Sequence, residues 1–185
     1  MKSIIKATVF IVGSLLCLNA SWTPIKGWLS AQLIRYSWHQ TISSQKKVNP
    51  WPWADTYPIA ELSFLRLNKS IVVLNGGDPT TLAFSIGAIA PFNQTLSVQP
   101  FVVAGHRDTH FSFLDEVFMS DIISLADKNG QSQLYQVEAI DIIDASTGNL
   151  PVLADDSSLI LITCYPFNDI GGNSNERYVI TAKPL

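Results

Sequence analysis

From Glu61 to the C-terminus, the chain alternates short apolar runs with turn residues, a pattern typical of β-strands. Turn signals separate the runs, among them Asn75–Pro79, Asn129-Gly130 and Gly171-Gly172-Asn173. The apolar runs predict eight strands, at residues 61–67, 70–75, 81–86, 99–104, 121–126, 132–143, 158–164 and 177–182. One short helical turn is expected at Phe113–Phe118. Eight short strands with so little helix predict an all-β fold, either a barrel or a sandwich.

The N-terminal segment follows a different pattern. Lys2 and Lys6 precede an uncharged stretch from Ala7 to Ile25, of which the strongly apolar part ends at Leu18. That stretch has about the length needed to cross a bilayer, and lysines on its N-terminal side place that end in the cytoplasm. The large Leu18 makes Leu18-Asn19-Ala20 a poor cleavage site. We therefore expect residues 1–25 to be an uncleaved membrane anchor rather than a cleaved signal peptide.

Residues 26–48 are predicted to form a juxtamembrane helix and a linker. Pro24 suits a first helical turn, and the tail at Thr41–Lys47 is polar and linker-like. The apolar residues at helical spacing are Ile25, Trp28, Leu29, Leu33 and Tyr36. The run Pro50-Trp51-Pro52-Trp53 then enforces an extended path, and its tryptophans are expected to cap a core rather than to shape a binding wall. The remaining residues, 49–185, are expected to form one domain that holds the predicted strands.

Composition and charge argue against two classes of protein, disordered chains and nucleic-acid-binding proteins. The 185 residues are enough for one ordinary domain, and 47% hydrophobic with 15% charged residues excludes a disordered chain. The formal net charge is −3, but residues 27–185 carry −6, because residues 1–26 include three lysines and no acid. An acidic domain argues against a nucleic-acid partner, since phosphate binding needs a basic face.

The chain has two cysteines, Cys17 in the apolar run and Cys164 near the C-terminus, and we expect no disulfide between them. Zinc is not expected, because Cys-x-x-Cys is absent and the His106 and His110 pair lacks the glutamate of the zinc-protease helix motif. The adjacent acids Asp115-Glu116 are expected to be solvated rather than to bind calcium. We expect no metal and no cofactor, so a free Cys164 in an exported domain needs another explanation.

Three apolar runs carry a reactive residue at one end. The first, Phe101–Ala104, delivers His106 after a glycine, and the second, Leu159–Thr163, ends at Cys164. The third run begins with Arg177. Because the second and third runs are neighbours in sequence, they can pair antiparallel and bring Arg177 close to Cys164.

These three residue types suit covalent thiol catalysis. A thiol is mostly protonated at neutral pH and needs a base or a nearby positive charge to become a nucleophile. His106 can exchange a proton with Cys164 and later protonate a leaving amine, and Arg177 can donate hydrogen bonds to an oxyanion. His110 is the competing base, and Asp108 could orient a histidine or pair with Arg107. The alternative is a core cysteine, a loop histidine and a surface arginine.

The order of the residues separates this pattern from other cysteine enzymes. His106 precedes Cys164, whereas papain-like proteases place the cysteine first. Caspase-like enzymes share the order found here, but their Gln-Ala-Cys-x-Gly motif is absent and the strand pattern does not suit an α/β sheet.

The segment Ile160–Cys164 resembles the Thr-Leu-x-Thr-Cys motif of the sortases, with isoleucine in place of the first threonine. The upstream histidine and the arginine at the start of the next strand fit the same family. A marine proteobacterial subgroup of sortases is similar in three further segments, Asn49–Thr56, Ala104–Phe111 and Thr163–Phe167. The resemblance extends from the anchor to residue 182.

This resemblance implies an eight-stranded sortase-type β-barrel with short helical turns, and a membrane-anchored cysteine transpeptidase. It assigns catalysis to His106, Cys164 and Arg177, with His106 preferred over His110 because it directly follows Ala-Gly. Substrate binding falls to Ala104, Gly105 and Thr163.

The implied substrate is an exported protein with a Leu-Pro-x-Thr-Gly-like C-terminal signal. Cys164 would attack the Thr–Gly carbonyl, and an amine acceptor would resolve the thioester. The implied location is the inner membrane, with the catalytic domain on the periplasmic side. Two alternatives remain: a related cysteine hydrolase that uses water, and a non-enzymatic exported β-domain.

Overall fold

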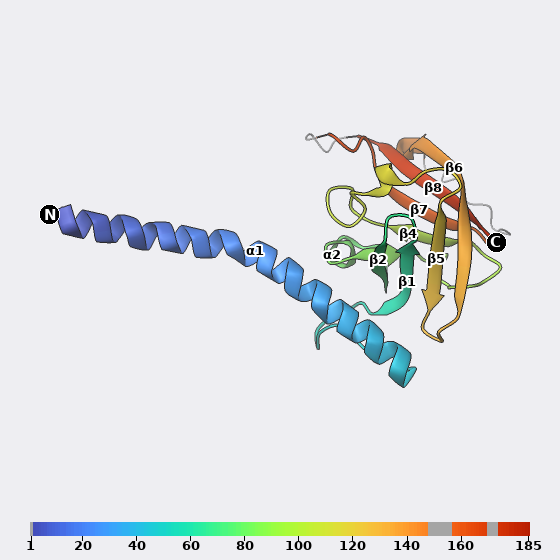
Figure 1. Cartoon of the computed structure of the whole chain (residues 1–185), viewed down its shortest axis with the longest axis horizontal. Helices are drawn as coiled ribbons and strands as arrows, with labels where there is room; N and C mark the ends of the chain where they lie inside the picture. Colours follow the sequence, from blue (N-terminus) through green and yellow to red (C-terminus); the bar gives the residue numbers. More distant parts are fainter. Residues whose placement is uncertain (1, 148–156, 170–173) are drawn as a thin grey trace.

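The computed structural model describes residues 2–147, 157–169 and 174–185. Within them, eight strands close into a barrel, and a long N-terminal helix passes along the barrel and projects beyond it (Figure 1). The strands are β1 (Pro58–Phe64), β2 (Lys69–Asn75), β3 (Ile86–Ala88), β4 (Phe101–Ala104), β5 (Ile122–Asp127), β6 (Ser132–Asp144), β7 (Leu159–Cys164) and β8 (Glu176–Pro184). The helices are α1 (Lys2–Ser44) and α2 (Pro79–Leu82), with short 3-10 turns at Leu114–Glu116 and Ala145–Thr147. The predicted eight-stranded barrel is confirmed.

The order of the strands around the barrel is β1-β2-β3-β4-β7-β8-β6-β5. Neighbouring strands are antiparallel except for β2 with β3 and β4 with β7, which are parallel. The β5–β6 hairpin turns at Asn129-Gly130 as predicted, where Gly130 has φ +77° and the Asp127 carboxylate accepts hydrogen bonds from the amides of Asn129 and Gln131. The predicted turn at Gly171-Gly172-Asn173 lies outside the described residues.

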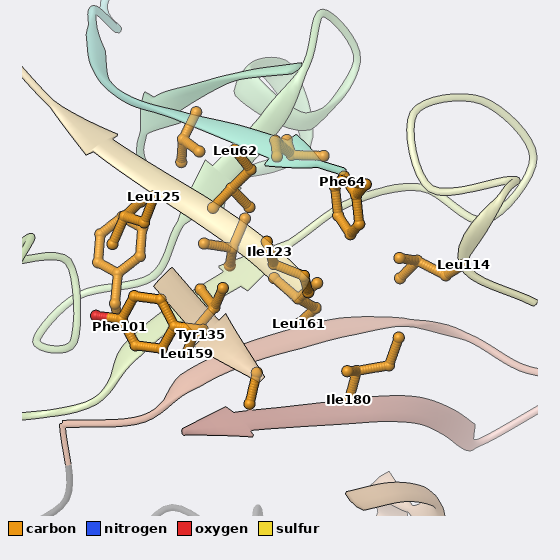
Figure 2. Close-up of a cluster of buried hydrophobic side chains, with 14 of the residues drawn as sticks. Leu62, Phe64, Phe101, Leu114, Ile123, Leu125, Tyr135, Leu159, Leu161 and Ile180 are labelled. Carbon is orange, nitrogen blue, oxygen red and sulfur yellow. The ribbon is translucent and has the colours of Figure 1, made fainter. Parts of the chain in front are cut away.

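The barrel interior is filled by side chains that alternate along the strands, as expected when one face of each strand is buried. Figure 2 shows this cluster, with aliphatic side chains of several strands meeting around Ile123 and Leu161. Strand β7 is buried on both faces, because Leu159 and Leu161 point into the barrel core while Ile160 and Ile162 pack with Val102 and Val179 on the other side. A strand held on both faces is a rigid support for Cys164 at its end.

One predicted strand, 81–86, is wrong over most of its length. Residues 79–82 form α2, and the strand β3 begins only at Ile86. Asp78 caps the helical turn, with its carboxylate accepting hydrogen bonds from the amides of Thr80 and Thr81 at 3.0 Å each. Pro79 follows in the first turn, where its missing N–H costs nothing. The helical turn predicted at Phe113–Phe118 is confirmed at Leu114–Glu116.

Helix α1 also differs from the prediction. It is continuous from Lys2 to Ser44 with Pro24 inside it, so residues 1–25 and 26–44 are not separate elements and the linker begins later than residue 41. The apolar residues that repeat at helical spacing are largely exposed, Trp28 at 65% and Tyr36 at 62%. The helix instead packs on β2 through Ile34 and Trp38, beside Val72 and Leu74.

Polar contacts fix this packed face of α1 to the barrel. The Trp38 indole donates a hydrogen bond to the Glu61 carboxylate at 3.3 Å, and the Ser37 hydroxyl donates to the Val48 carbonyl. The apolar repeat at helical spacing therefore predicted the helix, but Ile34 and Trp38, which pack on the barrel, are not part of that repeat.

The prediction of a transmembrane anchor in residues 1–25 is not supported. Within the part of the chain that the structure describes, no helix has the length and apolar character needed to cross a membrane. The strongly apolar run ends at Leu18 and is well short of the roughly 20 apolar residues that a spanning helix needs.

The two tryptophans of the proline-rich run have different environments. Trp51 is half-buried against the cluster under α1 and meets Phe84 edge to face, with ring centroids 4.8 Å apart. Trp53 is 78% exposed. Core capping is therefore confirmed for Trp51 and wrong for Trp53.

Candidate active site

The parallel pairing of β4 with β7 brings two of the predicted reactive residues to the same end of the barrel. The last paired residues are Ala104 and Ile162. His106 and Cys164 each lie two positions beyond this pair. Because the two strands are parallel, their C-terminal ends lie at the same edge of the sheet. Two hydrogen bonds extend the connection: the Gly105 amide donates to the Ile162 carbonyl at 3.1 Å, and the Thr163 hydroxyl donates to the Gly105 carbonyl at 2.8 Å.

Gly105 is required at this junction by its close approach to the core. A Cβ atom at Gly105 would lie 2.7 Å from Ile86 Cγ2 and 2.7 Å from Phe111 Cδ2, distances that side chains essentially never show. The absence of a side chain therefore allows the segment before His106 to rest directly on two buried residues.

Replacing Gly105 with alanine should lower the free energy of unfolding by about 1–3 kcal/mol, because the added methyl group overpacks a closed core. Thermal melting should show this as a fall in Tm of about 2–4 °C for each kcal/mol. Gly27→Ala is the control, since a Cβ there meets nothing within 4 Å. An unchanged Tm for Gly105→Ala would show that the junction is looser than described.

The antiparallel pairing of β7 with β8 places Arg177 directly opposite Cys164, as the sequence predicted. The pairing continues one step beyond the cysteine, because the Tyr165 amide donates to the Glu176 carbonyl at 3.1 Å. Arg177 Nη1 donates to the Ser174 carbonyl at 3.1 Å and to the Glu176 carbonyl at 2.8 Å. Within the described residues Arg177 forms no ion pair, and its Nε and Nη2 have no hydrogen-bond partner, so these donors remain available.

Exposure separates the residues that can meet a substrate from those that support the site. His106 is exposed, while Cys164 and Arg177 are half-buried. Ala104 is also half-buried, but Gly105 is buried and Thr163 is only 2% exposed, with its hydroxyl turned to Gly105. Thr163 and Gly105 thus hold the two strand ends together, and the assignment of Ala104, Gly105 and Thr163 to substrate binding stays a prediction.

The competing base, His110, has a different setting from His106. Its Nε2 faces the Ala83 carbonyl at 3.5 Å, at the end of α2. Burial lowers the pKa of His110 and the positive charge of His106 lowers it further, against an opposing contribution from the Ala83 carbonyl. The two histidines are therefore close in space, but His106 is the one that lies two positions beyond the last β4–β7 pair, as Cys164 does.

Asp108 pairs with Arg107 rather than with a histidine. Arg107 Nε donates to Asp108 Oδ1 at 2.7 Å. The hydrogen bond from Arg107 lowers the pKa of Asp108, and the positive charges of Arg107 and His106 act in the same direction. Of the two roles that the sequence left open for Asp108, the structure shows the ion pair.

The sequence did not single out a group of aromatic rings next to the cysteine. Tyr165 stacks on Tyr178 with ring centroids 6.2 Å apart, and Phe167 meets Tyr178 edge to face at 5.0 Å. Tyr178 lies opposite Thr163 in the β7–β8 register, and Tyr178 and Phe167 pack against the barrel core, so these rings lie on the core side of the strand end that carries Cys164. Burial raises the pKa of Tyr178, with the negative charges of Asp115 and Tyr165 adding to it.

Among the described residues, no group of three or more histidine, cysteine or acidic side chains is placed to hold a metal ion. Of the two acids considered for calcium, Glu116 pairs with Lys69 at 3.2 Å. Both cysteines are free, Cys17 on the exposed surface of α1 and Cys164 half-buried in the site. One thiol, one imidazole and one guanidinium group, those of Cys164, His106 and Arg177, are the groups that the sequence predicted for catalysis, and this assignment stays a prediction.

Comparison with known proteins agrees with this geometry. The family model for the sortase domain matches residues 63–185. Sortase D of Bacillus subtilis (strain 168) is 28% identical over 123 residues, which cover 66% of this chain and 61% of that relative. The chain thus spans less than two thirds of the length of this relative.

Solved structures show the same fold at low sequence identity. A Clostridium perfringens Sortase D5 transpeptidase has a TM-score of 0.63 and 18% identity, covering 84% of this chain and 96% of that one. Sortase A from Corynebacterium diphtheriae has a TM-score of 0.60 and 23% identity, covering 74% and 64% of the two chains. With the family model spanning most of the chain and the barrel matching in space, the chain belongs to the sortase family.

Proposed function

We propose that this protein is a cysteine transpeptidase that cleaves an exported protein at a Leu-Pro-x-Thr-Gly-like C-terminal signal and transfers it to an amine. Members of the sortase family are cysteine transpeptidases that act on exported proteins carrying such signals. The observation that carries the proposal is the register of the β7–β8 pair, which sets Cys164 opposite Arg177, with His106 at the adjacent end of β4.

The proposed reaction has two steps. In the first, the Cys164 thiolate attacks the carbonyl carbon of threonine in the signal, the Thr–Gly C–N bond breaks, and protonated His106 donates its proton to the leaving amine. The threonine carbonyl is then a thioester on Cys164. In the second step an incoming amine loses a proton to His106 and attacks the thioester, which forms a new amide bond and releases the thiolate.

Arg177 is proposed to stabilise the negative oxygen that forms in both steps. Its guanidinium group lies on the strand facing Cys164, and its Nη1 bonds to Ser174 and Glu176 hold its position while leaving other donors free within the described residues. A fixed, charged hydrogen-bond donor stabilises the transition state most when it points at the atom on which negative charge develops.

Replacing Arg177 with alanine should lower kcat/KM by about 10²–10³, the usual cost of losing one such donor. Tm should stay close to that of the parent protein, because the bonds lost are at a half-exposed strand end. Arg177→Lys should rescue activity only in part, since the ammonium group of lysine cannot reproduce the planar fork of N–H donors on the arginine guanidinium group. An Arg177→Ala protein that keeps most of its activity would remove arginine from the reaction.

We also propose that the catalytic domain works on the extracytoplasmic side of the membrane. The support is the pair of lysines before an apolar run at the N-terminus and the exported nature of sortase substrates. Cell fractionation with a protease-accessibility assay would test this, and a domain protected in intact spheroplasts would contradict it.

The activity itself is tested with peptides. The purified full chain is incubated with a set of Leu-Pro-x-Thr-Gly peptides with varied x, with and without hydroxylamine as a small amine acceptor, and the products are identified by mass. A transpeptidase gives a hydroxamate ending at threonine. Cleavage with no amine adduct would indicate the hydrolase alternative. Failure to cleave any peptide, with Cys164 inert to a thiol-reactive probe, would favour the non-enzymatic alternative.

A further inference from the structure

Arg107 is buried although both of its neighbours in sequence are exposed. Its side chain is only 7% accessible, between His106 and Asp108 at the surface. A buried guanidinium group is costly unless its donors are hydrogen-bonded, so its partners identify what the side chain is placed to do.

Those partners lie in the segment that follows the nucleophile. Arg107 Nη1 donates to the Pro166 carbonyl at 2.6 Å, and Nη2 donates to the Asp169 carbonyl at 2.8 Å. On its other side, the guanidinium group is held by the Asp108 carboxylate, at 2.7 Å from Nε and 3.3 Å from Nη2. One side chain therefore ties the turn that carries His106 to the segment that leaves Cys164.

The bonds to the carbonyls, rather than the ion pair, are the informative contacts. The Asp108 side chain is 72% exposed, and ion pairs at such exposed positions contribute little to stability. Two carbonyls fix the direction of the planar fork in a way that a single carboxylate at the surface cannot. The cis peptide bond at Tyr165-Pro166 lies in the segment that Arg107 holds.

Arg107 also lies within electrostatic range of the thiol. Its hydrogen bond to Asp108 raises the pKa of Arg107, burial opposes this, and the negative charges of Asp108, Asp169 and Cys164 raise it further. The guanidinium group is therefore a permanent positive charge in the field of the cysteine. The other charged or titratable groups around Cys164 are His106 after β4, Arg177 and Tyr178 on β8, and Tyr165 in the following segment.

We propose that Arg107 is a positioning residue of the transpeptidase site, which locks the His106 turn against the Pro166–Asp169 segment and keeps positive charge beside the Cys164 thiolate. The inference rests on the proposed function for its meaning in catalysis. The predicted effect of Arg107 on the reactivity of the Cys164 thiol does not depend on any substrate. The role of Arg107 and the proposed function can therefore be tested separately.

The test uses the full chain with Cys17→Ala, so that Cys164 is the thiol that reacts. Arg107→Met removes the charge and all donors, and Arg107→Lys keeps the charge without the fork. Arg66→Met is the matched control, because Arg66 likewise bonds a carboxylate, Asp121 at 2.7 Å, and a backbone carbonyl, that of Glu116, at a position outside the candidate site. Each protein is measured for Tm, for peptide kcat/KM, and for the rate of iodoacetamide alkylation across pH.

We expect Arg107→Met to slow alkylation of Cys164 at neutral pH by about tenfold, because a nearby positive charge favours the reactive thiolate and this variant removes it. Arg107→Lys should keep most of the alkylation rate but lose about tenfold in kcat/KM, since the charge remains and the geometry is lost. Arg66→Met should change neither rate.

A purely structural role would lower Tm while leaving the rate of Cys164 alkylation unchanged, and that result would overturn the inference. If Arg107→Met fails to fold, full kcat/KM in Arg107→Lys would overturn it equally. If the parent protein cleaves no peptide while Arg107→Met still slows alkylation, then the proposed function fails and the placement of Arg107 beside the thiol stands.

Discussion

Replacing Cys164 with alanine should abolish peptide cleavage, with a loss on the order of 10⁴–10⁶ in rate, because the covalent intermediate of the proposed mechanism forms on this thiol. Cys164 sits at the end of a strand buried on both faces and opposite Arg177. The fold should survive, since the thiol is half-buried and an alanine leaves the strand pairing intact. Steady-state cleavage of the signal peptide and Tm on the same protein measure the two effects.

Cys17→Ala is the matched control, because Cys17 is the other free thiol and lies on the exposed surface of α1. That variant should retain the activity of the parent protein. Full turnover by Cys164→Ala, or loss of activity in Cys17→Ala alone, would reject Cys164 as the nucleophile.

Replacing His106 with alanine should lower kcat/KM by about 10²–10⁴, the usual contribution of a positioned general acid and base. His106 is exposed and lies two positions beyond the last paired residue of β4, level with Cys164 on β7. Both the protonation of the leaving amine and the deprotonation of the acceptor depend on it in the proposed reaction.

His110→Ala provides the comparison, since the two histidines are four residues apart in sequence and close in space. His110 faces the Ala83 carbonyl, and burial lowers its pKa, so less of it carries the proton that the leaving amine needs. We expect this variant to keep activity within a few-fold of the parent. If His110→Ala were the inactive variant and His106→Ala the active one, the assignment of the base would be reversed.

The pattern of apolar runs and turn residues was enough to predict most of the barrel strands. It also predicted the β7–β8 pairing, which places Arg177 opposite Cys164. Strand β7 is an unbroken apolar run ending at Cys164, and β8 is the next apolar run along the chain, so their antiparallel pairing follows from the short connection between them. The parallel neighbour β4 is separated from β7 in sequence by β5 and β6, and spacing gave no means of placing it. The expected pairing of His106 with Cys164 rested on their residue types, on their places at the ends of apolar runs, and on the family resemblance.

Other features depended on contacts that the sequence does not display. The apolar repeat in α1 could not say which side packs on the barrel, because Ile34 and Trp38 alternate with polar residues on the packed face. Asp78-Pro79 fits a helix start as well as a turn, and the local pattern does not distinguish the two, so α2 was not predicted. Arg107 does not stand out in the sequence, because a charged residue between His106 and Asp108 is normally a surface residue. Only its bonds to the Pro166 and Asp169 carbonyls distinguish it.

Direct detection of the covalent intermediate tests the central claim more closely than any activity loss. The full chain is mixed with a Leu-Pro-x-Thr-Gly peptide that it cleaves, quenched in acid within the first turnover, and analysed by intact mass and by peptide mapping. We predict a mass increase equal to the acyl part ending at threonine, located on Cys164 and removed by hydroxylamine. Turnover with no adduct, or an adduct on any residue other than Cys164, would contradict the proposed mechanism.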